Sequence, residues 1–179
     1  MEEPLEHLPD GLAREEFCRL YRQHLEPHRE GLVRTLTQLL DRTDYSSPVD
    51  HLDLGVFADE SGDGHVSVWC YFNGPNRRVS GTEPSLFAGK SVHLTEGIRV
   101  PIHDPGAYEF STADASITVV MEWVESCWED AGGAAYAIPA TITGHENCCG
   151  SGEVKPLNGA ARARVAPQRR GSKRSKPST

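Results

Sequence analysis

The stretch that decides the fold is HLDLGVFADESGDGHVSVWCYF, residues 51–72. Apolar residues occupy every second position on both sides of a central loop rich in Gly and Asp. Such alternation is typical of strands with one buried face, and two runs joined by a Gly/Asp loop predict a β-hairpin. The apolar positions are Leu52, Leu54, Val56 and Ala58 before the loop, and Val66, Val68, Cys70 and Phe72 after it.

Two helices are predicted on the N-terminal side of this hairpin. Apolar residues recur at helical spacing between residues 10 and 26, with Asp10 as a suitable N-cap. Pro27 interrupts the pattern, because proline lacks the amide donor that a helix interior requires. The pattern then resumes from Leu32 to Leu40. We therefore expect two helices, or one long kinked helix.

The C-terminal side predicts further strands and one more helix. Residues 92–102 alternate again and predict one or two short strands. A helix is expected from Thr112, acting as its N-cap, to the stop at Gly132. Residues 136–142 predict a last strand, which Pro139 would confine to a sheet edge. This order predicts an α+β fold, in which the N-terminal helices and one later amphipathic helix pack on a small, mostly antiparallel sheet.

Charge divides the chain into two parts. Residues 1–158 contain 11 Lys and Arg against 26 Asp and Glu, a net charge of −15, whereas residues 159–179 contain seven Lys and Arg and no acid. We therefore expect a single acidic α+β domain over residues 1–158 and a disordered basic tail over residues 159–179. A basic arm can hold phosphates without base specificity, so weak nucleic-acid association through the tail is one alternative function.

Composition also indicates a compartment and a source. No apolar run is long enough to span a bilayer, and the first ten residues carry four acids but no Lys or Arg, so we expect neither membrane association nor a secretory signal. The five cysteines are odd in number and scattered, which favours a reducing cytoplasm over a disulfide framework. Arg outnumbers Lys 14 to 4, which is typical of a high-GC bacterial genome.

The densest cluster of soft metal ligands is His145, Cys148 and Cys149. Zinc accepts imidazole and thiolate ligands, so a second alternative function is a metal-dependent enzyme with zinc at these residues. The competing interpretation is a Gly-flanked loop with exposed thiols, because adjacent cysteines rarely ligate one tetrahedral ion. No other cofactor is predicted, and no pattern marks a catalytic residue.

Two further patterns fall short of known sites. Residues 84–91, PSLFAGKS, lack the first glycine of a phosphate-binding loop. Residues 59–64, DESGDG, begin like a calcium loop, but its twelfth position is Cys70 in place of a bidentate Glu. We interpret the first as a surface loop and the second as the hairpin turn.

The leading hypothesis is therefore a non-enzymatic protein-binding or regulatory module of the cytoplasm. The negative charge of residues 1–158 would attract a basic protein partner and accelerate its association. Trp69, Tyr71 and Arg77 belong to residue types enriched in interface hot spots. The pattern is equally compatible with Trp69 and Tyr71 packing beneath a helix. In architecture alone the chain resembles the small acidic α+β immunity proteins of bacteria, which cap toxins. That resemblance also implies protein binding.

Overall fold

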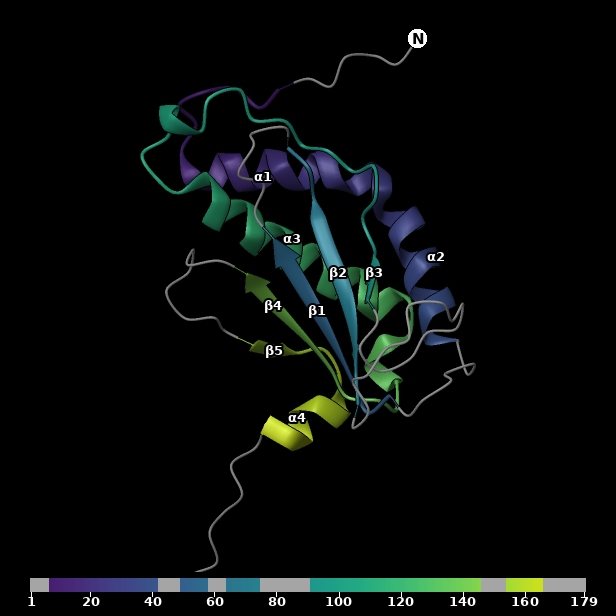
Figure 1. Cartoon of the computed structure of the whole chain (residues 1–179). Coiled ribbons are helices and arrows are strands. Elements are labelled where there is room, and N and C mark those ends of the chain that lie inside the picture. The colour runs from purple at the N-terminus through teal and green to yellow at the C-terminus, as the bar shows by residue number, and fades with distance from the viewer. Residues whose placement is uncertain (1–6, 42–48, 58–63, 75–90, 146–153, 166–179) are drawn as a thin grey trace, which may run out of the picture.

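A computed structural model of the chain describes residues 7–41, 49–57, 64–74, 91–145 and 154–165. They form one five-stranded sheet with helices on one face, so the predicted α+β fold is confirmed (Figure 1). The hairpin lies at its centre; β2 has the alternating burial that the sequence predicts, and β1 has it except at Gly55, which is also buried. All neighbouring strands are antiparallel except β1 and β4, which run parallel. The order across the sheet is β3 (Ser91–His93), β2 (Ser67–Asn73), β1 (His51–Phe57), β4 (Ala140–His145) and β5 (Val154–Pro156).

Three helices build the layer behind the sheet. α1 (Arg14–Leu25) and α2 (Arg29–Leu40) are separated by a 3-10 turn at Glu26–His28, where Pro27 breaks the helical pattern as predicted. α3 (Thr112–Asp130) packs on β1 and β4, and both N-terminal helices pack against α3 (Figure 1). α3 is therefore buried on two sides. None of the helices in the described ranges is both long enough and apolar enough to cross a bilayer.

Both predicted helix caps need correction by a few residues. α1 begins after Ala13, which makes no side-chain cap, so Asp10 is not its N-cap. The cap of α3 is Ser111, whose hydroxyl accepts a hydrogen bond from the Asp114 amide at 3.2 Å. Thr112 is instead the first helical residue and is buried. The stop at Gly132 is confirmed, since this residue adopts a left-handed φ of 84°.

The strand predicted around residue 140 is not at an edge. β4 begins at Ala140, so Pro139 precedes the strand and its missing donor costs no ladder bond. Its carbonyl accepts a hydrogen bond from the Leu52 amide at 2.9 Å. The edge beyond β4 is β5. Of the one or two short strands predicted over residues 92–102, one is present as β3, and residues 98–102 form only isolated bridges to other segments of the chain.

The described chain continues past the predicted boundary at residue 158. Residues Gly159–Val165 form α4, which lies beside β5 in Figure 1, and Ala161 in it is buried. The amide side chain of Asn158 starts this helix by accepting a hydrogen bond from the Ala161 amide at 2.9 Å. The first residues assigned to the disordered tail are therefore helical, while residues 166–179 lie outside the described part.

Candidate functional site

The sheet face turned away from α1, α2 and α3 carries an unusual mixture of aromatic and polar side chains. On β1 and β2 the apolar residues of the alternation point toward the helices and are buried, so the intervening residues point the other way. Most of these side chains are half-buried, and α1, α2 and α3 all lie on the other face of the sheet. We call this surface the open face; its residues used below are His51, Asp53, Trp69, Tyr71, His93 and Thr141.

A stacked pair of rings dominates one side of the open face. Trp69 on β2 lies opposite His93 on β3, with ring centroids 4.8 Å apart and planes only 9° from parallel. The Trp69 ring is also fixed at its one polar atom, because Nε1 donates a hydrogen bond to the Ser67 hydroxyl at 3.1 Å. The indole is therefore held in one orientation while still half-exposed.

This geometry excludes one of the two uses of Trp69 and Tyr71 that the sequence leaves open, namely packing beneath α1, α2 or α3. Both lie on the open face, with Asp53 of β1 directly opposite Tyr71, and neither packs beneath α1, α2 or α3. The residues that do face the helices are their neighbours Val68, Cys70 and Phe72, all fully buried. The role of Trp69 and Tyr71 in binding a partner stays a prediction, now with a surface on which to test it.

A chain of hydrogen bonds crosses the other side of the open face. The Thr141 hydroxyl on β4 donates to Asp53 Oδ1 at 2.8 Å, and it contacts His51 Nε2 at 3.0 Å. Since the single hydroxyl proton goes to Asp53, His51 Nε2 must donate the second bond. Nδ1 of the same ring is buried and has no hydrogen-bond partner among the residues that the structure describes. Thr141 is only 5% exposed, so this chain positions side chains and does not present a nucleophile.

The predicted metal cluster falls largely outside the described residues. His145 is the last residue of β4 and is described by its backbone alone, while Cys148 and Cys149 lie in the undescribed range 146–153. Among the described residues, no group of three or more His, Cys, Asp or Glu side chains could hold a metal ion. A zinc site at His145, Cys148 and Cys149 stays a prediction.

Other predicted features also lie outside the described ranges. Arg77, the calcium-like residues 59–63 and most of the phosphate-loop-like segment, residues 84–90, are among them. Ser91, the last residue of that segment, is the first residue of β3. Nucleic-acid association through residues 166–179 likewise stays a prediction.

The cysteines within the described ranges are free thiols suited to packing. Cys70 and Cys127 are fully buried, and Cys18 is half-buried against the core. Burial raises the pKa of Cys127 to about 11 and raises the pKa of Cys70 further, so both stay protonated at neutral pH. Desolvation raises the pKa of Cys18 as well. Cys70 and Cys127 therefore act as small hydrophobic residues of the core.

Four members of the open face, His51, Asp53, His93 and Thr141, were not predicted as site residues. His51 and Asp53 occupy odd-numbered positions of β1, which lie on the same face of the hairpin as Trp69 and Tyr71 of β2. The same alternation that predicts the two strands could therefore have placed these four side chains together. Thr141 carried no such signal, because its contact with Asp53 depends on the parallel pairing of β1 with a strand 88 residues away.

Comparisons with known proteins identify a family without a known activity. A family model described as "Family of unknown function (DUF6389)" matches residues 12–160. No curated protein and no solved structure gives a significant match. The matched range runs from just before α1 to the start of α4 and contains the whole open face.

Proposed function

Because the chain belongs to the DUF6389 family, whose function is unknown, its role must be argued from its surface, and we propose that it is a non-enzymatic binding module. Its open face docks a basic protein partner in the bacterial cytoplasm. The observation that carries the proposal is the Trp69–His93 stack beside Tyr71, on a sheet face that α1, α2 and α3 leave uncovered. The architectural resemblance to immunity proteins supports the same class of role.

The aromatic side chains supply the binding energy of this proposal. Trp and Tyr are the residue types most enriched in interface hot spots, because each buries a large area at the cost of only two side-chain torsions. The stack on His93 and the hydrogen bond to Ser67 already fix the Trp69 ring. Little further side-chain entropy is lost on docking, and that preorganisation favours affinity.

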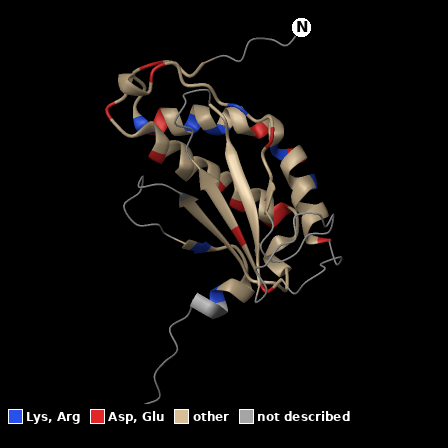
Figure 2. Ribbon diagram, in the orientation of Figure 1, with Lys and Arg blue, Asp and Glu red and all other residues tan. Residues whose placement is uncertain are grey.

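The acidity of the chain supports a basic partner. Residues 1–158 carry a net charge of −15, and acidic residues are spread over the helices and loops around the sheet in Figure 2. A field of this sign attracts positively charged proteins and accelerates their association. The association rate should therefore fall as salt is added, because salt screens long-range attraction.

The sheet edges favour docking on the face over pairing with the edges. Both edge strands, β3 and β5, are only three residues long, and β5 contains Pro156, which has no amide donor. Short, proline-bearing edges are poor templates for an added strand. A partner therefore gains more by covering the open face.

The test is capture of a partner from the native host by purified wild-type protein and by the variant Trp69→Ala/Tyr71→Ala. A photoreactive benzoylphenylalanine placed at Tyr71 marks what touches the open face. The expected result is one stoichiometric basic protein at physiological salt, crosslinked from position 71 and lost from the double variant. Glu129→Ala, at an exposed position of α3, is the matched control and should retain the partner.

Two results would contradict the proposal. One is the absence of any stoichiometric basic partner at physiological salt. The other is equal capture by the wild type and by the folded Trp69→Ala/Tyr71→Ala variant. A cytoplasmic location belongs to the same proposal, and the free thiols Cys18, Cys70 and Cys127 support it.

A further inference from the structure

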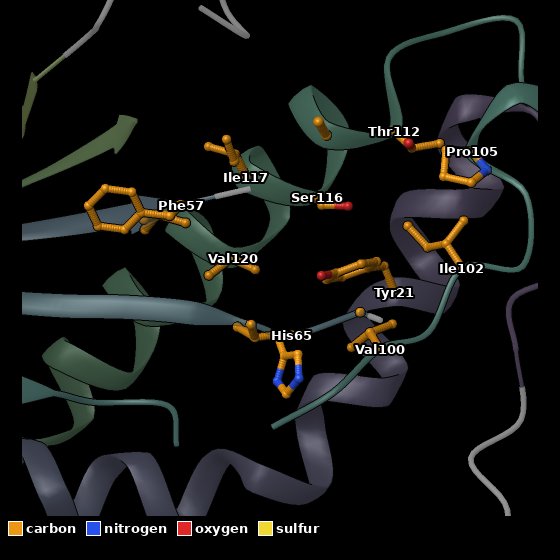
Figure 3. A pocket seen from close by; sticks show the side chains of 14 residues that line it. Tyr21, Phe57, His65, Val100, Ile102, Pro105, Thr112, Ser116, Ile117 and Val120 are labelled. Carbon is orange, nitrogen blue, oxygen red and sulfur yellow. The ribbon is translucent and has the colours of Figure 1, made fainter. Parts of the chain in front are cut away.

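A cavity of about 230 Å³ lies on the helix side of the sheet, separate from the open face (Figure 3). Its floor is the end of β1 and the start of the segment that leads into β2. One wall is the N-terminal half of α3, and the others are α1 and residues 100–105. Five segments of the chain therefore line one space.

The walls of this cavity are mostly apolar and deeply buried. Val56, Val66, Val100, Ile117 and Val120 line it, and each is at most 3% exposed. Protein interiors normally pack with few voids larger than a water molecule, and apolar voids of this size are destabilising. A space that could hold about eight waters, at about 30 Å³ each, is thus far larger than a packing defect. Its mostly apolar lining with a few polar groups is typical of a small-molecule site, and its volume, below that of most ligand pockets, restricts it to a small ligand.

Two hydroxyl groups point into the space between α1 and α3. Figure 3 shows the oxygen atoms of Tyr21 and Ser116 directed into it, with Thr112 nearby at the start of α3. Thr118 donates its hydroxyl proton to the Asp114 carbonyl at 2.8 Å, whereas among the described residues no hydrogen bond engages the Ser116 hydroxyl. Ser116 is therefore able to donate to a ligand and to accept from one.

The charges around the cavity restrict the class of ligand. Among the residues that the structure describes, no Lys, Arg, Asp or Glu lines the cavity, and the titratable groups of these lining side chains are the Tyr21 phenol and the exposed His65. A charged ligand would lose its hydration without gaining a counter-ion, which is strongly unfavourable. We propose that this cavity binds a small, uncharged, largely apolar molecule of about ten non-hydrogen atoms with one hydroxyl group, which the Ser116 hydroxyl recognises.

The test uses 2-naphthol, a neutral probe of this size, with titration calorimetry at pH 7. Two analogues separate the parts of the proposal: naphthalene lacks the hydroxyl, and 2-naphthoate carries a charge. We expect 2-naphthol to bind about threefold to tenfold more tightly than naphthalene, because one hydrogen bond is gained. It should bind at least about tenfold more tightly than 2-naphthoate.

Variants at one position test the location of the site. Ser116→Leu fills the cavity and should abolish binding, while Ser116→Ala should weaken binding of 2-naphthol about threefold to tenfold without affecting naphthalene. Glu129→Leu, which puts the same side chain on an exposed position of α3, should bind like the wild type. Thermal unfolding of each variant shows that it is folded. If Ser116→Leu does not fold, Ser116→Ala decides.

The proposal is overturned if the wild-type protein does not bind 2-naphthol, or if folded Ser116→Leu or Ser116→Ala binds it unchanged. Tighter binding of 2-naphthoate would overturn the uncharged class. Because the cavity and the open face lie on opposite sides of the sheet, Trp69→Ala/Tyr71→Ala should bind 2-naphthol normally. A failure here is thereby distinguished from a failure of the proposed docking function.

Discussion

Thr141 donates a hydrogen bond to Asp53 across the parallel pair of β4 and β1, and the two residues are direct neighbours in the strand register. His51 completes the chain from the next position on the same face of β1. Thr141 is buried, so replacing its hydroxyl leaves both neighbours without their shared partner. The contact thus links β1, the central strand of the sheet, to β4, which lies near the C-terminal end of the described chain.

Thr141→Val should lower the free energy of unfolding by about 1–3 kcal/mol, because it removes the hydroxyl but keeps the side-chain volume. Urea unfolding measures the change. Thr141→Ser keeps the hydroxyl and should cost clearly less than Thr141→Val. Nitrogen-15 NMR of the histidine rings should also find His51 protonated at Nε2. Equal stability of Thr141→Val and the wild type would show that the chain contributes nothing.

Asn158 should be among the most sensitive polar positions. Its side chain is 2% exposed; Nδ2 donates to the Ile138 carbonyl at 2.8 Å and to the Tyr136 carbonyl at 3.2 Å, and Oδ1 accepts from the Ala161 amide. Asn158→Ala should therefore cost at least about 2 kcal/mol in urea unfolding.

The matched variant Asn158→Asp separates the two halves of this side chain. It keeps an acceptor for the Ala161 amide but turns a carboxylate toward two backbone carbonyls in a buried site. At pH 7 it should be less stable than Asn158→Ala. If Asn158→Asp were the more stable of the two, capping of α4 would outweigh the bonds to residues 136 and 138.

Two glycine-to-alanine changes should have opposite signs. A Cβ on Gly144 would lie 2.6 Å from Ile117 Cγ2 of α3, so Gly144→Ala forces α3 away from β4 and should cost about 1–3 kcal/mol. A Cβ on Gly31, within α2, meets nothing within 4 Å. Gly31→Ala should stabilise the protein by about 0.5–1 kcal/mol, because alanine favours the helix. Thermal or urea unfolding of both variants checks the pair.

Stability should fall at alkaline pH through the buried cysteines. The pKa of Cys127 rises from 9.0 to about 11 on folding, so the unfolded chain loses this proton at a lower pH than the folded protein. The stabilising effect is complete below about pH 9 and is lost as the pH rises toward 11. At about 1.4 kcal/mol per pKa unit, the loss from this residue is up to about 2–3 kcal/mol.

Urea unfolding at pH 7.5, 9 and 10.5 measures this dependence. Cys127→Ala should be less stable at neutral pH, since it leaves a small void, but its stability should fall less steeply between pH 9 and 10.5. The same slope in both proteins would assign the alkaline loss to other groups.

The local elements of the fold could be predicted because local patterns specify them. The alternation in residues 51–72 predicts both strands of the hairpin, and Pro27 and Gly132 mark a break and an end that the structure confirms. The cap of α3 was misplaced by one residue because Ser111 and Thr112 are both good N-caps, and that of α1 by three residues because its actual N-cap, Ala13, has no capping side chain.

The long-range relations could not be predicted. Nothing in residues 140–145 indicates that they run parallel to β1, and Pro139 pointed wrongly to an edge. The helix α4 was missed because its Ala- and Arg-rich composition resembles that of the tail beyond it. Its one local signal is Asn158, a good N-cap directly before Gly159.

The parallel pairing of β1 with β4 has a consequence for biosynthesis. The ribosome releases β1 long before β4, since the paired residues Asp53 and Thr141 are 88 positions apart. Until then β1 has a neighbour on one edge only, and its other edge is an unpaired row of amides and carbonyls that can recruit a second nascent chain. A chain that ends before residue 140 therefore lacks β4 and is prone to aggregate through the unpaired edge of β1.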